Sequence, residues 1–234
     1  MHNGQGDGDT ESGSYTLLGG TVRPSNWKTL TRNEGALWAL PSHDEWHKAA
    51  YYDPRTEAEG GPPGDTHYWL YPTRSNTDPT RATATTTGDI SNPGANVANY
   101  LRGADWNGQD GNLTTVGSAG PLSASYYQTL DQAGNVWEII EEPQMLGEDV
   151  DAMIFRGGGW RASVIFLDAT SGGAGISPGH YGWEDVGFRM VVVPEPSTLI
   201  LAVLGLAVAA VRAATRSKQR AGSRGLAPSQ PAAL

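Results

Sequence analysis

The sequence predicts an irregular α+β domain with little regular secondary structure, followed by an apolar helix near the C-terminal end. The chain of 234 residues contains 31 glycines, few aliphatic runs, and eight tryptophans with nine tyrosines. Such a composition indicates a core of aromatic side chains joined by long turns rather than one of leucine-rich helices. The length fits one domain, and the composition changes sharply at Pro194–Pro196.

One helix start is clear. Ser42 and Glu45 form a capping box, in which each side chain bonds the backbone N–H of the other residue. Trp46 and two alanines that follow it at helical spacing give the segment one narrow apolar face. The spacing predicts a helix over 43–52, and Asp53-Pro54 should end it.

Three further peptides predict turns and short strands. Gly134-Asn135 is a turn dipeptide, and the β-prone run 136–140 behind it predicts a strand. Arg156–Trp160 contains three consecutive glycines, which favour positive φ or close backbone approach and disfavour a helix. The run 187–193 predicts a closing strand.

Charge and cysteine content exclude several classes of function. All 25 acidic residues lie at or before Glu195, so the body is strongly negative and would repel the phosphates of a nucleic acid. The chain has no cysteine, which excludes disulfides, thiolate metal sites and cysteine nucleophiles. Stabilisation must therefore come from packing, or from ions held by oxygen ligands.

The C-terminal tail carries a targeting pattern. An apolar run from Thr198 to Val211 is shorter than the ~20 residues of a free-standing span, and the alanines that follow a snorkelling Arg212 bring it near that length. The basic residues after the run predict that this end stays in the cytoplasm while the acidic body faces outward. The order of Pro194, Glu195 and Pro196, the apolar run and a basic cluster beginning at Arg212 resembles the PEP-CTERM sorting signal of Gram-negative bacteria, which exosortase machinery processes. An ordinary membrane anchor or a buried helix are the alternatives.

Four peptides in order carry a second resemblance: Leu40–Trp46, Gly134–Glu138, Arg156–Trp160 and Gly187–Arg189. Together they resemble the formylglycine-generating-enzyme, or sulfatase-modifying-factor, family, in particular its bacterial members with a PEP-CTERM tail. The resemblance covers roughly Trp38 to Val191, and in the third peptide glycine stands where the family has serine. It implies an irregular α+β fold related to C-type lectins.

The resemblance also implies a domain organisation. Residues 1–193 would form the family domain, 194–220 the sorting signal with its transmembrane-like helix, and 221–234 a disordered tail. The start, Met1–Asp9, lacks the basic and apolar segments of a signal peptide. In the tailed relatives a peptide like this one lies inside the domain, so the resemblance implies that the first part of the family domain is missing, which would leave apolar surface that favours association.

The family's chemistry is expected to be absent. Members with oxidase activity hold copper(I) with two cysteines and convert a sulfatase cysteine into formylglycine, and the corresponding positions here are Ala162 and Leu167. A cuprous ion needs sulfur or imidazole donors, so we expect no copper and no oxidase activity. The leading hypothesis is a non-catalytic domain with a binding or surface-matrix role; the alternatives are an oxidase-type enzyme with an atypical site, or a fragment without independent function.

The resemblance further implies calcium, which takes six to eight oxygen ligands. One site would use the side chains of Asp131 and Glu138 with the backbone carbonyls of Gly134 and Val136. A second would use the side chains of Asn99 and Asp110 with the backbone carbonyls of Tyr100 and Asn112. Turn formation alone also explains the Asp, Asn and Gly content of both regions.

Two histidines share a face of the predicted helix. His43 and His47 are spaced i, i+4, which could present both imidazoles to one metal ion. No third ligand is within reach by sequence, so we interpret them as surface polar positions.

Overall fold

The computed structural model describes residues 13–20, 24–145, 151–171, 174–176 and 184–193. The chain divides into two compact units, Met1–Val192 and Val193–Leu234. The apolar helix and the sorting signal predicted at 194–220 lie outside the described residues.

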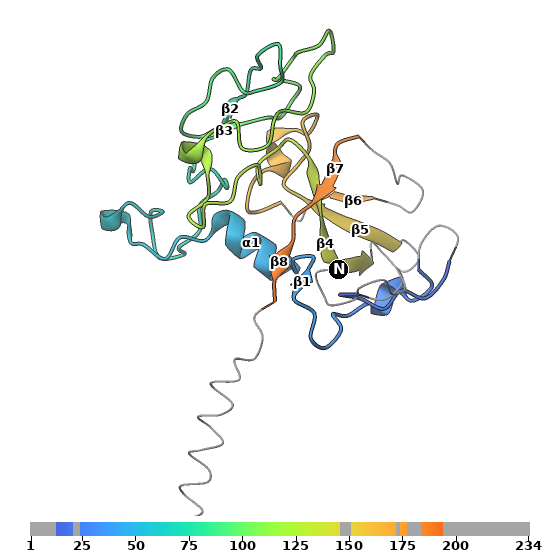
Figure 1. The fold of residues 1–234 in the computed structure, drawn as a ribbon. Coiled ribbons are helices and arrows are strands. Elements are labelled where there is room, and N and C mark those ends of the chain that lie inside the picture. Colours follow the sequence, from blue (N-terminus) through green and yellow to red (C-terminus); the bar gives the residue numbers. More distant parts are fainter. Residues whose placement is uncertain (1–12, 21–23, 146–150, 172–173, 177–183, 194–234) are drawn as a thin grey trace, which may run out of the picture. The chain divides into compact units, whose positions relative to one another are not determined.

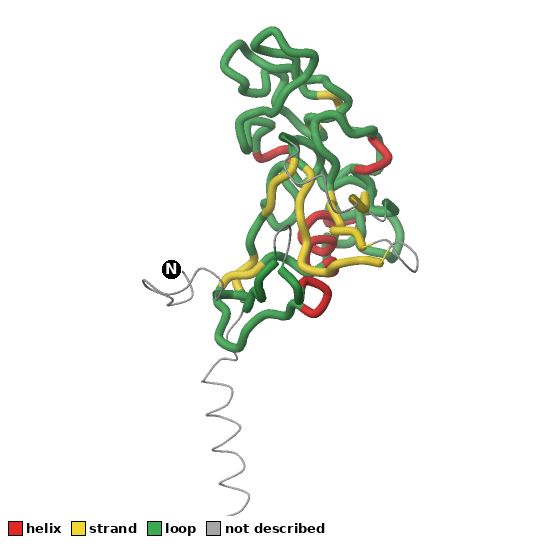
Figure 2. The backbone as a smooth tube through the Cα atoms, turned by 90° about the vertical axis from the view of Figure 1, so that its right-hand side faces the viewer, coloured by secondary structure: helices red, strands yellow, loops and turns green. Residues whose placement is uncertain are grey.

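Loops make up most of the described chain, as the tube drawing shows (Figure 2). Among the described residues, the helical elements are η1 (Trp27–Thr29), α1 (His43–Tyr51), η2 (Glu57–Glu59), η3 (Pro121–Ser123) and η4 (Val164–Phe166), and α1 is the one α-helix among them. The strands are β1 (Trp38–Ala39), β2 (Thr80–Arg81), β3 (Val97–Ala98), β4 (Trp137–Met145), β5 (Asp151–Arg156), β6 (Ala174–Ile176), β7 (Val186–Phe188) and β8 (Val191–Val192). This mixture, poor in helices, agrees with the irregular α+β class that the family resemblance implies and with the long turns that the composition predicted.

A four-stranded sheet with the order β6-β5-β4-β7 forms the largest regular element of the first unit (Figure 1). Strand β4 runs antiparallel to β5 and parallel to β7, so that Ile139 lies opposite both Phe155 and Phe188. Two smaller pairs complete the topology: β1 with β8, antiparallel, and β2 with β3, parallel.

The predicted helix is confirmed as α1. The Ser42 hydroxyl accepts a hydrogen bond from the Glu45 N–H at 3.2 Å, and a Glu45 carboxylate oxygen accepts one from the Ser42 N–H at 2.8 Å. The Arg32 guanidinium beside Glu45 holds the pKa of that carboxyl below its usual value. The helix ends at Tyr51, because Tyr52 is extended (φ −76°, ψ 133°) ahead of Asp53-Pro54.

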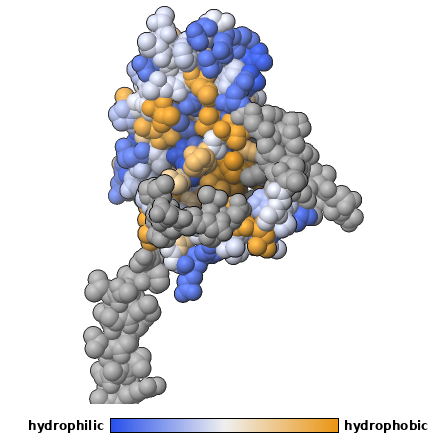
Figure 3. Space-filling model, turned by 45° about the vertical axis from the view of Figure 1, so that its right-hand side comes forward, coloured by the Kyte–Doolittle hydropathy of each residue, from blue (hydrophilic) through white to orange (hydrophobic). Residues whose placement is uncertain are grey.

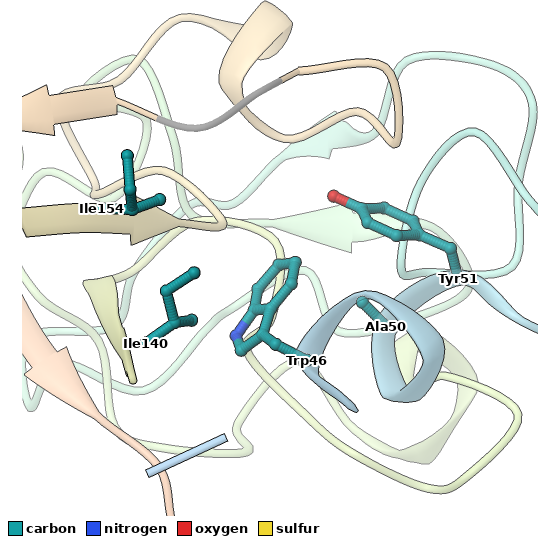
Figure 4. Close-up of a cluster of buried hydrophobic side chains, with 5 residues drawn as sticks. All are labelled: Trp46, Ala50, Tyr51, Ile140 and Ile154. Carbon is teal, nitrogen blue, oxygen red and sulfur yellow. The ribbon is translucent and has the colours of Figure 1, made fainter. Parts of the chain in front are cut away.

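Helix α1 packs on the sheet through a small hydrophobic cluster. Trp46, Ala50 and Tyr51 meet Ile140 of β4 and Ile154 of β5 (Figure 4). Trp46 is completely buried, and a tryptophan in such a position contributes about 3–5 kcal/mol to stability. The predicted apolar face was right for Trp46 and Ala50 and missed Tyr51, whose hydroxyl donates to a buried backbone carbonyl at 3.0 Å.

The turn at Gly134-Asn135 is confirmed and connects three distant segments. Both residues have positive φ, 80° and 66°. The Gly134 N–H donates to the Gly157 carbonyl at 2.8 Å, and the Asn135 N–H donates to the Asn99 carbonyl at 2.7 Å. The strand predicted at 136–140 is confirmed as β4, which begins one residue later, at Trp137, and continues to Met145.

The single closing strand predicted at 187–193 was wrong in one respect. The segment forms two strands that pair with different partners: β7 with β4, and β8 with β1. Two residues, Arg189 and Met190, separate them and let the chain leave one sheet for the other.

Candidate functional site

The glycine-rich segment after β5 forms the centre of the candidate site. Gly157 and Gly158 have φ of 84° and 74°, so both are in the left-handed region that favours glycine. A Cβ on Gly158 would lie 2.8 Å from Leu167 Cδ1 and 3.2 Å from Ala162 Cβ. The side chains of Leu167 and Ala162 therefore both lie against the backbone at Gly158.

Ala162 and Leu167 are thus brought together, and they are the two residues that the family resemblance aligns with the oxidase thiols. Leu167 is completely buried in a cluster with Tyr71 and Tyr100. Ala162 is buried in a second cluster with Trp137. Both positions contribute carbon to the core and no metal donor.

A buried carboxylate lies beside this segment, at a position that the sequence did not reveal. Asp185 is 5% exposed, and its carboxylate oxygen is 2.5 Å from where a Cβ of Gly159 would lie. Trp137 Cδ1 is 2.8 Å from the same point. A side chain at 159 would meet both groups, which explains why glycine replaces the serine that the resemblance predicts.

Burial raises the pKa of the Asp185 carboxyl. A carboxyl whose pKa is raised by folding binds its proton more tightly in the folded state, so this group lowers stability once the pH exceeds its unfolded pKa of about 3.9. We expect Asp185→Asn to be more stable than the wild type at pH 7, with a difference that disappears below the unfolded pKa. Urea unfolding of both proteins at several pH values measures this, and a variant less stable at pH 7 would contradict it.

The Glu138 carboxylate is held by groups other than a metal ion. One of its oxygens accepts from Trp46 Nε1 and from Arg189 Nε, both at 2.5 Å, and the other accepts from Arg189 Nη2. The Glu138 side chain is 5% exposed. A guanidinium therefore already supplies the positive charge that calcium would bring.

The other members of this predicted calcium set do not improve the fit. The Asp131 carboxylate accepts from the Gly117 N–H at 2.6 Å, and burial raises its pKa. Gly134 lies in the turn and Val136 directly precedes β4. With both carboxylates engaged by donors, the set does not fit a calcium ion in this arrangement.

The second predicted set, around Asn99, fits better. Asn99 is 2% exposed, and its Oδ1 is buried without a hydrogen-bond partner. Its Nδ2 donates to the Asn112 carbonyl at 2.9 Å. The Tyr100 carbonyl accepts from the Gly103 N–H, whereas the Asp110 side chain is 79% exposed and pairs with an arginine. Two of the predicted ligands therefore lie close together: the unpaired Asn99 Oδ1 and the backbone carbonyl of Asn112. The Asp110 carboxylate is instead paired with Arg102.

The two helix histidines stack without forming a metal cluster. The ring centroids of His43 and His47 are 5.9 Å apart, and His47 Nε2 lies 3.3 Å from the Ala169 carbonyl. Burial lowers the pKa of His47. Across the described ranges, no three His, Cys, Asp or Glu side chains gather as metal ligands would.

Comparison with protein families decides the relationship. Residues 12–193 match the sulfatase-modifying factor enzyme 1-like domain. The chain belongs to the sulfatase-modifying factor family. Residues 192–217 match the PEP-CTERM protein-sorting motif, which implies processing by exosortase-type machinery and points to the bacterial cell envelope.

Two solved structures resemble this family member at low identity. CarF shares 21% identity over 71% of this chain and 52% of its own, with a TM-score of 0.45. Treponema denticola variable protein 1 shares 20% identity over 74% of this chain and 54% of its own, with a TM-score of 0.44. The chain thus spans about half the length of these structures. No curated protein was found to match it.

The structure leaves the predicted membrane helix without a test. Within the part of the chain that is described, no helix has the length and apolar character needed to cross a bilayer. The apolar run 198–211 and Arg212 belong to the residues outside that part.

Proposed function

We propose that this chain is a non-catalytic sulfatase-modifying-factor domain, displayed at the bacterial cell envelope, where it has a binding or surface-matrix role. The observation that carries the proposal is the packing of Ala162 and Leu167. Both residues fill buried positions on either side of Gly158, where the family's oxidase members would present thiols. The chain would thus keep the family fold, while apolar side chains occupy the positions of the catalytic thiols.

The available donor atoms support this proposal. Copper(I) is a soft ion that needs thiolate, thioether or imidazole ligands. The segment 159–167 offers none of these groups. The hydrophobic clusters that contain Ala162 and Leu167 consist of aromatic and aliphatic side chains. The buried acid Asp185 is a hard oxygen donor and would not hold a cuprous ion.

A gain-of-function comparison tests the proposal. We expect the wild type to take up no copper(I) in competition with a chromogenic chelator, and to form no formylglycine on a cysteine-containing sulfatase peptide followed by mass spectrometry. Ala162→Cys/Leu167→Cys should gain copper(I) binding, because the structure places both positions beside Gly158.

The single variant Ala162→Cys is the matched control, since one thiolate is a poorer site than two. Cooperative thermal unfolding of each variant shows that it has folded. Formylglycine production by the wild type would overturn the proposal in favour of an active enzyme with an atypical site.

Display at the envelope follows from the sorting motif, and we propose that the apolar run 198–211 anchors the chain in the membrane. Arg212 and the basic residues after it would remain on the cytoplasmic side. The acidic body would then face outward, where its negative charge disfavours anionic ligands.

We also propose that the domain binds calcium through the set around Asn99. The unpaired Oδ1 of Asn99 is the support, because a buried oxygen without a donor is costly unless a cation or water completes it. To bind the ion, the Asp110 carboxylate would have to release the hydrogen bond that it accepts from Arg102.

Calcium should therefore raise the unfolding temperature of the wild type. At a free concentration 100 times the Kd, a single site adds about 2.7 kcal/mol. Asn99→Ala should abolish the shift, and Asp131→Asn should retain it, because Asp131 belongs to the set that does not fit. Differential scanning calorimetry with and without a chelator separates these outcomes. A shift lost only in the Asp131 variant would assign calcium to the other set.

A further inference from the structure

In the segment that contains β7 and β8, large apolar side chains are exposed to solvent, the reverse of the usual pattern. Phe188, Met190 and Val192 are 64%, 51% and 60% exposed, and they occupy alternate positions. Arg189, between the first two, turns inward to the buried Glu138 carboxylate. Strands with one solvated face normally turn polar residues outward. Here the outward positions are large and apolar.

The strand partners extend this surface. Residues directly opposite each other on neighbouring strands share a face of the sheet. Ile139 of β4 lies opposite Phe188, and Trp38 of β1 lies opposite Val192. Both partners are only partly buried, and Ile139 also packs against the buried cluster that contains Trp137. We name Trp38, Ile139, Phe188, Met190 and Val192 the terminal apolar face.

Hydrophobic residues also gather in the middle of the side of the molecule drawn in Figure 3, with hydrophilic residues along its upper edge. Large exposed apolar residues that gather on one surface mark sites of contact with a partner or a membrane. The terminal apolar face directly precedes the predicted membrane anchor in the sequence, and this position favours a membrane over a protein partner.

The terminal apolar face is tied to the predicted anchor by a short link. Only residues 193–197 separate Val192 from the apolar run that begins at Thr198. The six residue steps from Val192 to Thr198 span at most about 22 Å when fully extended. If the run is inserted in a bilayer, Val192 is therefore held near the lipid headgroups.

We propose that the terminal apolar face docks on the surface of the bilayer that holds the C-terminal run, a step that rests on the anchoring proposed above. The link turns docking into an intramolecular event, so a surface too small to bind lipid from solution is sufficient. Trp38 suits this docking, because an amphipathic ring is favoured at the level of the lipid headgroups. The acidic body directs the choice to zwitterionic rather than anionic lipid.

The chain's lack of cysteine allows a clean labelling experiment. The full chain is reconstituted in phosphatidylcholine liposomes as Met190→Cys, labelled with an environment-sensitive fluorophore, and lipids with a nitroxide headgroup serve as the quencher. Leu122→Cys and Val116→Cys, 61% and 81% exposed in the wild type, are the matched controls. Quenching at 190 should be several-fold stronger than at either control, with a blue-shifted emission.

A double variant distinguishes docking of the terminal apolar face from quenching caused only by the nearby membrane anchor. Phe188→Ser/Val192→Ser with the label at 190 should lose most of the quenching and the blue shift while its unfolding temperature stays unchanged, because both residues are exposed. Quenching that persists in this background, or that never exceeds the controls, overturns docking while flotation of the chain with liposomes upholds the anchor. A chain that fails to float with liposomes refutes the anchor and the docking together. Self-quenching without lipid that rises with protein concentration would assign the surface to a second copy of the chain and overturn the lipid proposal.

Discussion

Replacing Arg189 with leucine is expected to lower the free energy of unfolding by about 3–5 kcal/mol, because it leaves the Glu138 carboxylate buried without its counter-charge. The guanidinium donates to both Glu138 oxygens and also, at 3.1 Å, to the Leu130 carbonyl. In the variant, the carboxylate would keep only the hydrogen bond from Trp46. Urea unfolding at pH 7 measures the loss.

The pair between Arg161 and Glu184 provides the matched control. Its side chains are 48% and 64% exposed, and exposed pairs contribute about 0–1 kcal/mol. Arg161→Leu should therefore have little effect on the same measurement. Equal losses in the two leucine variants would show that Arg189 does not compensate a buried charge.

Local parts of the fold could be predicted because their causes lie close together in the sequence. The capping box depends on Ser42 and Glu45, three residues apart, and it fixed the start of α1 correctly. The turn at Gly134-Asn135 depends on the backbone preferences of two adjacent residues. In both cases the interacting groups are neighbours, so no tertiary information was needed.

The role of Glu138 could not be derived in this way. Its partners Arg189 and Trp46 lie 51 and 92 residues away in the chain. A carboxylate next to a turn is equally compatible with a calcium ligand and with half of an ion pair. Only the packing of α1 against β4 and the return of the chain after β7 decide between these, and neither is encoded near Glu138.

Asp185 shows the same limit for the candidate site. In the sequence it is one of two adjacent acids before the final motif, with nothing to mark it as buried. Its burial comes from its place beside Gly159 and Trp137. The substitutions at Ala162 and Leu167, by contrast, were visible in the sequence, because a missing thiol is a property of the residue itself.

Gly134→Ala is expected to cost more than about 4 kcal/mol, and to leave little cooperatively folded protein. Two effects add at this position. Its φ of 80° is unfavourable for an L residue by about 1–2 kcal/mol. The new Cβ would also overlap the backbone carbonyl of Asn99, and a backbone atom held by its own hydrogen bond to Asn135 cannot move aside. Calorimetry and urea unfolding both report the loss.

Gly35→Ala isolates the first effect. Gly35 has nearly the same φ, 79°, and a Cβ there would meet nothing within 4 Å. It should therefore lose only the conformational part, about 1–2 kcal/mol, and the difference between the two alanine variants measures how tightly the turn is packed against Asn99. Since the Asn99 amide and the Gly157 carbonyl both depend on that packing, Gly134→Ala should also remove any calcium response at the Asn99 set. A Gly134 variant no less stable than the Gly35 variant would mean that the turn does not hold these segments together.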